Sequence, residues 1–422
     1  MTSPRISIIC ATAARPNPGM ASVDLAFQAL NRRYALGDAC YYQLYTAEEV
    51  YKNKSAGKKI YAKHGVPPLE YRCMRGKLDE IYDSDAIIFW GDFLHSARFL
   101  RDTGYRLERI GISNDAESGT AIAHRHFLLH DAPDEVLHKC FVYGGNLLFN
   151  TQGDYADDQY FKPLQRLFSN AGGVWMRDVF SGLRVSKILD DWNSSHTATD
   201  CSCILTEEDL KDLSRSQNIP CDTPTGRAGL FVGRSSYDTR CLHRFADEVG
   251  RTRGLKVEWM PWRLDAPSHL GGIPFRRSAG VTFCPYSTPM DLGDIFDLIQ
   301  SYDLIITDTY HLCVNAWRMG TPAICVADCT PADRWDISCG SVCRWRDKRW
   351  VFYSMYDALD FFVHARELNS HKRRKARIRQ LAVALEQPEI VSQIACELRR
   401  HAQAACRNLC SALNEVLRAK GD

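Results

Sequence analysis

The fold is decided by one stretch of the sequence, Ser301-Tyr-Asp-Leu-Ile-Ile-Thr-Asp-Thr-Tyr-His-Leu-Cys-Val-Asn-Ala-Trp-Arg-Met-Gly-Thr-Pro-Ala-Ile-Cys-Val326. It predicts a strand at Leu304–Thr307, a tight turn, a helix over His311–Met319, a second turn and a second strand. Gly320 favours the left-handed conformation that ends a helix, and Pro322 prevents the helix from continuing. Two apolar strands joined by a helix form the repeating unit of a parallel sheet.

Apolar runs of the same kind recur through the chain and alternate with helical patterns. Before residue 217 they are Ile6–Ala11, Ala86–Trp90, Arg109–Ser113, Phe141–Tyr143 and Gly173–Met176. After residue 229 they are Leu230–Gly233, Leu255–Trp259, Val281–Cys284, Leu304–Thr307 and Ala323–Ala327. Continuous apolar strands bounded by helices indicate parallel sheets that are covered on both faces, so we predict an α/β protein.

The length of 422 residues exceeds what one hydrophobic core usually supports, so two domains are expected. The segment Gln217–Gly229 is rich in Pro, Thr and Gly and is the predicted linker and hinge. This boundary gives a first domain at 1–216, a linker at 217–229, a second domain at 230–357 and a C-terminal helical segment at 358–422.

Composition excludes several classes of function. The 53 basic and 51 acidic side chains leave a formal net charge of only +2, so no global field attracts nucleic acid or an anionic membrane. The basic run at 371–377 lacks interleaved aromatic residues and is interpreted as a solvated helix face. No apolar stretch approaches 18 residues, and the apolar run near the N-terminus is too short for a signal peptide. We therefore expect a soluble, cytoplasmic protein.

Neither the cysteines nor the histidines predict a metal site. The 17 cysteines are scattered without a C-x-x-C pair, which favours buried, reduced thiols. Cys201 and Cys203 alternate within an apolar run and are expected on one face of a strand. The histidines between positions 124 and 138 lack an acidic partner at ligand spacing. No G-x-S-x-G, H-E-x-x-H or Walker pattern occurs, which removes the common hydrolase and NTPase interpretations.

His311 is the best candidate for chemistry. In an open parallel sheet, ligands bind at the carboxyl ends of the strands, where Asp308–His311 lies. The helix start favours anions and disfavours an imidazolium, so we expect a neutral imidazole that exchanges protons near pH 7. Asn315 and Arg318 fall one and two turns along the same helix face. The alternative is a histidine that only caps its own helix, and the residues leave both interpretations open.

A second candidate is Arg177-Asp178, which follows the strand Gly173–Met176 and precedes Ser181. An arginine at this place suits bidentate contacts to a phosphate or carboxylate. The alternative is an Arg177–Asp178 pair that only ties down its own loop. Weaker candidates are Asp92 and His95 after Ala86–Trp90, and Asp38 after Gly37.

Taken in order, these segments resemble the polysaccharide pyruvyl transferase family. Its members show an early glycine–aspartate turn, a glycine-rich strand exit, an R-D-x-x-S segment and an R-L-H helix start followed by A-x-x-x-G-x-P. The matching pieces here are Gly37-Asp38, Asp85–Asp92, Arg177–Ser181, Asp200–Leu205 and Asp308–Pro322.

Two departures from the family pattern concern the donor. Phe89-Trp90-Gly91 stands in place of the family's glycine triplet, and Thr309-Tyr310 replaces the Arg-Leu before the histidine. If the family arginine helps to hold a donor phosphate, Arg177 or Arg318 must supply that charge here.

The resemblance implies a GT-B-like pair of Rossmann-like domains with the reaction between them. It also implies transfer of a pyruvyl group from phosphoenolpyruvate to a sugar hydroxyl or diol, with no cofactor or metal. His311 would transfer a proton and Arg177 would hold the anion. The residues expected to bind donor or acceptor are Asp178, Asp92, Asn315, Arg318, Thr309, Tyr310 and Asp38. The alternatives are a glycosyltransferase with a nucleotide-sugar donor and a non-catalytic binding protein on the same fold.

Overall fold

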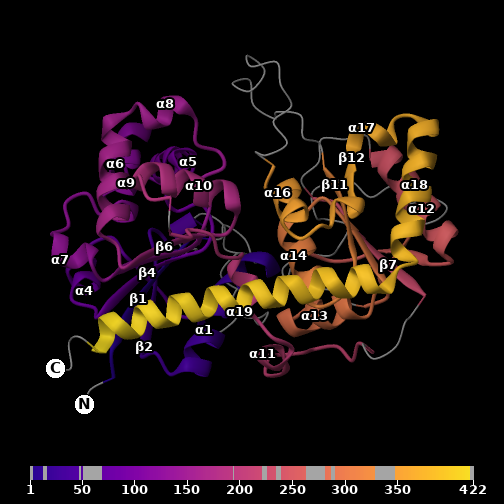
Figure 1. The fold of residues 1–422 in the computed structure, drawn as a ribbon, viewed down its shortest axis with the longest axis horizontal. Coiled ribbons are helices and arrows are strands. Elements are labelled where there is room, and N and C mark those ends of the chain that lie inside the picture. The colour runs from indigo at the N-terminus through magenta and orange to yellow at the C-terminus, as the bar shows by residue number, and fades with distance from the viewer. Residues whose placement is uncertain are drawn as a thin grey trace.

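The computed structural model describes residues 3–12, 17–46, 49–50, 69–192, 194–220, 226–233, 239–262, 281–286, 290–327 and 347–418. Within these residues the chain forms two six-stranded parallel sheets, each at the centre of its own α/β domain. Figure 1 shows the two domains side by side, with one long helix crossing both.

The first sheet has the strand order β3-β2-β1-β4-β5-β6, and all of its neighbouring strands are parallel. Its strands are β1 (Arg5–Cys10), β2 (Asp38–Gln43), β3 (Tyr71–Cys73), β4 (Ala86–Trp90), β5 (Cys140–Gly145) and β6 (Gly173–Met176). Its helices are α1 (Pro18–Tyr34), α4 (Leu78–Tyr82), α5 (Ala97–Arg109), α6 (Ala116–Phe127), α7 (Asp134–Leu137), α8 (Gln152–Tyr155), α9 (Asp158–Asn170) and α10 (Val179–Leu189).

Helices cover both faces of this sheet because successive side chains of a strand point to opposite sides. In β1, Ile8 packs in the core shared with α1, whereas Ile9 packs in the core shared with α5, α6, α9 and α10. Figure 1 shows α1 on one side of the sheet and α5, α6 and α9 on the other. This double burial explains why the strands are continuous apolar runs in the sequence.

The second sheet has the order β12-β11-β10-β7-β8-β9 and is also parallel. Its strands are β7 (Arg227–Phe231), β8 (Lys256–Trp259), β9 (Val281–Phe283), β10 (Leu304–Thr307), β11 (Ala323–Ala327) and β12 (Phe362–His364). The elements that connect or follow them are α12 (Thr239–Arg253), α13 (Leu292–Gln300), α14 (Tyr310–Arg318), α16 (Lys348–Met355), η4 (Leu359–Phe361), α17 (Ala365–Leu368), α18 (His371–Leu385) and α19 (Pro388–Arg418).

Both sheets therefore follow the same Rossmann order, in which the first and fourth strands lie side by side at the centre. In such a sheet the connections leave in opposite directions at this point, and a crevice opens at the carboxyl ends of the strands. The crevices lie beyond β1 and β4 in one domain and beyond β7 and β10 in the other. The expected fold class, two Rossmann-like α/β domains in a GT-B-like arrangement with C-terminal helices, is confirmed.

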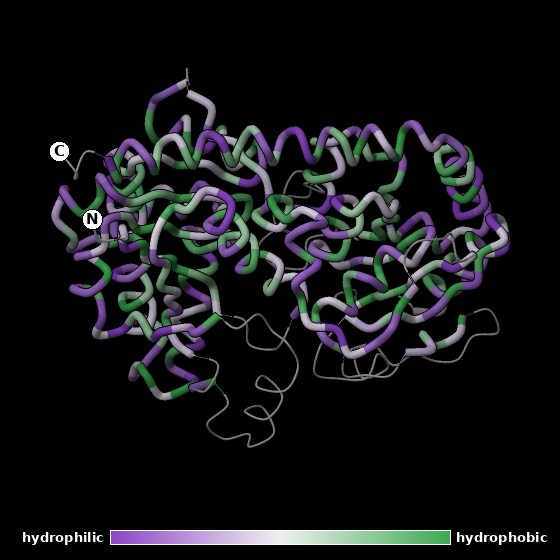
Figure 2. Tube along the Cα trace, turned by 90° about the horizontal axis from the view of Figure 1, so that it is seen from below, coloured by the Kyte–Doolittle hydropathy of each residue, from purple (hydrophilic) through white to green (hydrophobic). Residues whose placement is uncertain are grey.

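Helix α19 joins the two domains. It has 31 residues, and its buried side chains, which include Leu398, Ala402, Leu409 and Leu413, recur at helical spacing along one face. It packs against α14 in the second domain and β4 in the first. Figure 2 shows polar and apolar residues alternating along it, as expected for a helix with one buried face. No helix in the described ranges combines the length and apolar character that a membrane crossing needs.

Several local expectations differ from the structure. The run Arg109–Ser113 is not a strand, because Arg109 ends α5 and Gly111 turns the chain with φ 73°. Cys201–Ile204 forms a short 3-10 helix, η1, capped by the Asp200 side chain, so the two cysteines do not alternate on a strand. Strand β2 and the short strands β3 and β12 were not expected.

The domain limits also shift. Strand β7 begins at Arg227, so the last three residues of the expected linker belong to the second sheet, and 221–225 lie outside the described residues. The segment at 358–422 is not wholly helical, because it contributes β12 to that sheet. Before the linker, α11 (Glu207–Lys211) leads to Ser216, whose backbone N–H donates to Asp294 of α13.

Candidate functional site

Three side chains from distant parts of the sequence meet at one carboxylate. Asp200 Oδ2 lies 3.3 Å from Arg177 Nη1 and 3.7 Å from His311 Nε2. Asp200 Oδ1 is held by Ser202, which donates from its hydroxyl at 2.6 Å and its backbone N–H at 3.1 Å. Because one oxygen is fixed within η1, the other is left to face the arginine of the first domain and the histidine of the second.

Regular structure places each member of this cluster. Arg177 follows β6, and its backbone N–H donates to Gly145 O at 2.9 Å. The backbone of Thr197 bridges to Met176 of β6 in parallel fashion, which brings Asp200 to the same edge of the sheet. His311 lies in the first turn of α14, directly after β10. All three therefore lie at the carboxyl ends of strands, where parallel sheets bind ligands.

The three groups stabilise one another's charge. Burial works against ionisation of Asp200, but His311, Arg177 and the Ser202 hydrogen bonds outweigh it and hold the pKa of Asp200 below its usual value. Burial likewise opposes the charge on Arg177, yet nearby Tyr310 and Asp200 keep the pKa of that guanidinium above its usual value. Asp200 is therefore an ionised carboxylate beside a permanent cation and within 3.7 Å of the His311 ring.

Two aromatic rings, one from each domain, hold two cations at the edge of the cluster. The guanidinium carbon of Arg177 lies 4.7 Å from the ring centre of Phe93 and 4.9 Å from that of Tyr310. Lys348 Nζ, at the start of α16, lies 4.8 Å and 4.7 Å from the same two centres. Ring faces attract cations, but two cations on shared rings repel each other, so an anion between them is electrostatically favoured.

A small void of about 10 Å³ adjoins these cations. Its lining residues are Asn146, Arg177, Asp178, Tyr310, Lys348, Phe352 and Met355. Within the described part of the chain, the buried Nη2 of Arg177 has no hydrogen-bond partner. A void of this size holds about one water molecule, so a larger ligand enters only if the surrounding side chains move.

Two alternatives were a His311 that only caps its own helix and an Arg177 that only pairs with Asp178. The structure shows neither arrangement. Thr309 is the N-cap residue of α14, and the His311 ring faces Asp200 rather than capping its own helix. A Cβ added to Gly19, near the start of α1, would overlap the His311 side chain, so glycine permits this close approach. Arg177 pairs with Asp200 and not with its sequence neighbour Asp178.

Asp178 and Asn315 support the cluster from either side. Asp178 caps α10 by accepting from the Ser181 backbone N–H at 2.8 Å, and it accepts from Asn146 Nδ2 at 2.6 Å. Asn315 Nδ2 donates to His311 O at 2.7 Å and lies 3.2 Å from Ser22 Oγ of α1. Asn315 therefore connects the helix that carries His311 to the first domain.

Other expected site residues lie elsewhere. Arg318 lines a separate cavity behind α14 and not the void beside Arg177. Asp38 is exposed at the amino end of β2, which is the sheet edge opposite the crevice, so the expectation that it faces the cleft is wrong. Asp92 lies close enough to Arg177 to raise its pKa, and its own φ is 52°.

His95 lies in the core of the first domain and not at the strand exit where it was expected to act. His95 is buried against the rings of Phe89 and Phe168, and burial lowers its pKa to about 3, so it is a neutral core residue. Across the described ranges, no group of three His, Cys, Asp or Glu side chains has the arrangement of a metal centre.

Three residues in or beside the cluster had no role in the sequence-based prediction. They are Asp200, Lys348 and Phe93. Asp200 stood in a recognised segment, but the cysteine alternation after it suggested a strand. Phe93 follows the strand exit at Asp92 and could have been found by its position. Lys348 had no signal, because its approach to Tyr310 depends on how α16 packs on α14.

Comparison with known proteins shows a similarity in fold and none in sequence family. No family model matches the sequence, and no curated protein matches it. A putative UDP-N-acetylglucosamine 2-epimerase from Listeria monocytogenes aligns over 99% of this chain and 98% of that one, with a TM-score of 0.53 at 10% identity. UDP-GlcNAc 2-epimerase from Neisseria meningitidis, bound to UDP-GlcNAc, aligns over 97% and 100% with a TM-score of 0.49 at 9% identity.

A plant structure is similar to a lesser degree. Phytolacca americana UGT2, complexed with UDP-2fluoro-glucose and pterostilbene, aligns over 99% of both chains with a TM-score of 0.45 at 12% identity. At such identities structural similarity concerns the fold and not the activity. The resemblance to polysaccharide pyruvyl transferases thus rests on the motifs alone, whereas the Listeria structure supports a two-domain, GT-B-like fold along the whole chain.

Proposed function

We propose that this chain is a transferase that moves a group from a phosphate-bearing donor to a sugar hydroxyl. The observation that carries the proposal is the convergence of Arg177 and His311 on Asp200 between the two domains. An anion-binding group and a proton-transferring group then lie within reach of one small ligand. We further propose phosphoenolpyruvate as the donor and a pyruvyl group as the part transferred.

The cations suit an anionic donor. Phosphoenolpyruvate carries a carboxylate and a phosphate, and both need positive partners in a buried site. Arg177 offers a buried Nη2 with no partner in the described part of the chain, and Lys348 lies on the same two rings. Lys348 thereby compensates for Thr309, which occupies the position where pyruvyl transferases carry an arginine.

The acid–base pair suits the transfer step. The methylene carbon must gain a proton as a first sugar hydroxyl bonds through its oxygen to the enol carbon and loses its proton. Phosphate then leaves with the electron pair of its C–O bond, and the second hydroxyl of the diol bonds to the same carbon and loses its proton, which completes a cyclic ketal. His311 moves these protons, and Asp200 orients the imidazole and stabilises its protonated form. Asn315 Nδ2 donates to His311 O at 2.7 Å, and in this proposal Asp178 and Asp92 position the acceptor.

Entry of the donor requires movement, because the void beside Arg177 is only about 10 Å³. The moving parts in this proposal are the Lys348 side chain and the two domains, which contribute Phe93 and Tyr310 to the site. Closure after binding would then exclude water from the reacting groups.

A nucleotide sugar is the second candidate donor. It is favoured by the full-length likeness in fold to the Listeria protein, a putative UDP-N-acetylglucosamine 2-epimerase. Thr309 at the family's arginine position also favours it. A diphosphate could use Arg177 and Lys348 in the same way, so the two candidates differ in the donor and share the site.

A thermal-shift experiment separates the candidates, since a ligand that binds only the native state raises its Tm. Phosphoenolpyruvate, UDP-GlcNAc and inorganic phosphate are added separately to the native protein, to Arg177→Gln and to Arg101→Gln. Arg101 pairs with Asp154 at 2.6 Å in the first domain and serves as the matched control. Phosphoenolpyruvate should stabilise the native protein and Arg101→Gln but not Arg177→Gln.

The other outcomes decide against the first proposal. A shift with UDP-GlcNAc alone replaces phosphoenolpyruvate by a nucleotide sugar, and no shift with either organic donor favours a binding protein without transferase activity. Where phosphoenolpyruvate binds, release of phosphate on addition of a sugar acceptor completes the test.

A further inference from the structure

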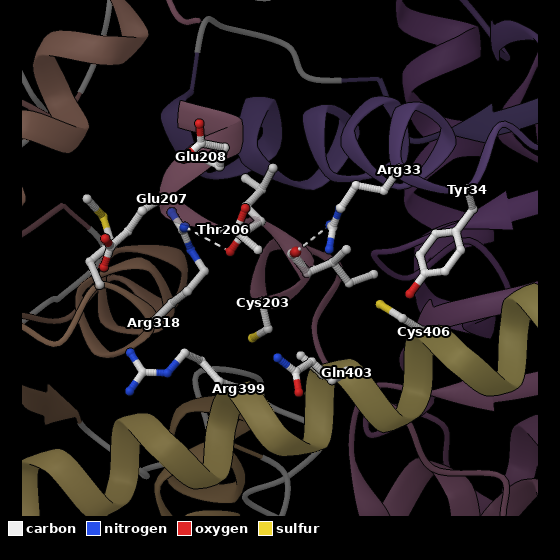
Figure 3. A pocket seen from close by; sticks show the side chains of 14 residues that line it. Arg33, Tyr34, Cys203, Thr206, Glu207, Glu208, Arg318, Arg399, Gln403 and Cys406 are labelled. Atoms are coloured by element: carbon white, nitrogen blue, oxygen red, sulfur yellow. Dashed lines mark hydrogen bonds between the residues drawn. The ribbon is translucent and has the colours of Figure 1, made fainter. Parts of the chain in front are cut away.

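A second cavity lies behind the catalytic cluster, at the junction of both domains with α19. Its volume is about 320 Å³, and none of its lining residues lines the void beside Arg177. Four elements form its walls, namely the end of α1, the η1–α11 segment, the end of α14 and the middle of α19. Figure 3 shows Arg318 on one side and Arg399 and Gln403 extending from α19 on the other. The volume is at the lower end of the range for small-molecule sites.

Arg318 is a buried cation that makes no ion pair within the described ranges, although Asp209 and Glu207 act on it from a greater distance. It is 5% exposed, and its guanidinium donates to Leu205 O at 3.2 Å and to Asn315 Oδ1 at 3.0 Å. Within the described ranges, its Nε has no hydrogen-bond partner and no carboxylate pairs with it. Burial lowers the pKa of Arg318 to about 10. An unpaired buried charge is costly, and an anion in the adjoining cavity would offset that cost.

The rest of the lining favours a small organic anion. Arg399 is exposed on α19, at the edge of the cavity facing Arg318. The walls also include the thiols of Cys203 and Cys406, which suit the carbon skeleton of a ligand. Arg33 is already engaged, because it donates to Ile204 O at 2.7 Å and lies 3.5 Å from Asp209.

Two carboxylates stand at the mouth of the cavity. Glu208 is exposed and pairs with Lys211 at 2.7 Å, which neutralises it. Glu207 is also exposed, and its charge opposes the effect of burial on Arg318 without outweighing it. The buried end of the cavity is therefore cationic and its mouth is acidic, so the anionic group of a ligand points inward to Arg318.

We propose that this cavity is a binding site for a small organic anion, of the size of a sugar phosphate, held between Arg318 and Arg399. The site is separate from the donor site of the proposed function, because Arg177, His311 and Lys348 do not line it. An anion bound here would also fix α19 against α14 and the first domain, since all three contribute to the walls.

Calorimetric titration of the full chain with glucose 6-phosphate tests the proposal, with glucose as the neutral control. Glucose 6-phosphate should bind the native protein, and Arg318→Gln and Arg399→Gln should each weaken binding at least tenfold. Arg399 is exposed, so its variant should fold even if the Arg318 variant does not. Arg400→Gln is the matched control, because Arg400 lies one position along α19 and pairs with Glu397 at 2.6 Å.

The Arg177→Gln variant distinguishes the two sites. The proposal requires that it bind glucose 6-phosphate like the native protein, even if it no longer binds phosphoenolpyruvate. Loss of glucose 6-phosphate binding in Arg177→Gln but not in Arg399→Gln would place the anion in the donor site and overturn the proposal. Failure of glucose 6-phosphate to bind the native protein would also overturn it, whatever the result with phosphoenolpyruvate.

Thiol alkylation locates the ligand independently. Cys406 lines the cavity, whereas Cys396 is exposed on the same helix outside it. Saturating glucose 6-phosphate should slow alkylation of Cys406 severalfold and leave Cys396 unchanged. Equal rates for Cys406 with and without the ligand would contradict binding at this place.

Discussion

Arg177 and Arg318 are buried to nearly the same degree, 4% and 5% exposed, yet their surroundings act on them in opposite directions. Burial opposes the charge of both. Near Arg177 this is outweighed by Tyr310 and Asp200, and the pKa of the guanidinium rises. Near Arg318 only neutral oxygens accept its hydrogen bonds, and burial lowers its pKa to about 10.

The difference separates a site that carries its own counter-ion from one that lacks it. The cluster at Asp200 is electrostatically balanced before any ligand arrives, so its cation can serve to orient a donor. At Arg318 the effects of Asp209 and Glu207 do not outweigh burial, so an anion in the cavity would further stabilise the charge. Burial of an arginine therefore does not by itself mark an active centre, and the partner of that arginine must be found as well.

The largest expected effect concerns the rate. His311→Ala should lower kcat by about 10²–10⁴-fold if His311 transfers protons, and should leave the fold intact. His130→Ala is the control, because His130 is an exposed histidine near Asp131 with no place in the cluster. The measurement is the steady-state rate with the donor identified by thermal shift. A His311→Ala enzyme with native kcat would remove the cluster from the mechanism.

Unfolding measurements test whether counter-ions explain the difference between Arg177 and Arg318. Arg177→Met leaves Asp200 buried without its arginine, so it should lower the free energy of unfolding by about 3–5 kcal/mol. Arg318→Met removes a cation that has no carboxylate partner, so only its hydrogen bonds are lost, at about 1–2 kcal/mol. Urea denaturation of both variants gives the two values. A loss in Arg318→Met as large as that in Arg177→Met would show that counter-ions do not explain the difference.

The sequence was most informative where a single local pattern determines the structure. The strands on either side of α14 were predicted because residues buried on both faces form continuous apolar runs. Strand β3 was missed because it has only three residues and includes Arg72, which is exposed. The segment Cys201–Ile204 was assigned wrongly because alternation alone cannot reveal that Cys201 packs against Gly144, where a Cβ would overlap its sulfur.

The same distinction applies to the site. Arg177 and His311 were each predicted as site residues because each follows a strand, and open parallel sheets bind ligands at the carboxyl ends of their strands. They belong to two different sheets, so their convergence was expected only from the resemblance, which places the reaction between the domains. Asp200 and Lys348 were not assigned, because their positions depend on how the two domains face each other. The cavity that the Arg318 side chain lines was not predictable either. Helical spacing places Arg318 on one face of α14 with His311, but it cannot show that α19 covers the C-terminal end of α14.

Asp24 in α1 is a buried acid, and burial affects its ionisation as it affects that of the two arginines. Burial raises its pKa to about 7, although Tyr71 donates a hydrogen bond to it. In the unfolded chain the pKa of an aspartic acid is about 3.9, so between that pH and pH 7 only the folded state keeps the proton. The contribution of Asp24 to stability is therefore fully present below about pH 3.9 and is lost as the pH rises through 7.

The stability of the protein should therefore depend on pH, and Asp24→Asn should remove the part of this dependence that Asp24 causes. Between pH 5 and pH 8 the Tm of the native protein should fall by several degrees relative to that of Asp24→Asn. Asp38→Asn changes an exposed carboxylate and should leave the difference unchanged. Parallel Tm curves for the native protein and Asp24→Asn would mean that Asp24 is ionised in the native state throughout this range.

The smallest expected effect separates the two roles of Arg177. Arg177→Lys keeps a cation beside Asp200 and should therefore avoid most of the loss of stability expected for Arg177→Met. A lysine cannot reproduce the planar fork that holds a phosphate or carboxylate through two hydrogen bonds, so KM for the donor should rise about tenfold, or ~1.4 kcal/mol, with kcat changed less. Arg101→Lys controls for the same substitution in another ion pair. If Arg177→Lys binds the donor like the native protein, Arg177 only neutralises Asp200, and Lys348 must be the residue that holds the anion.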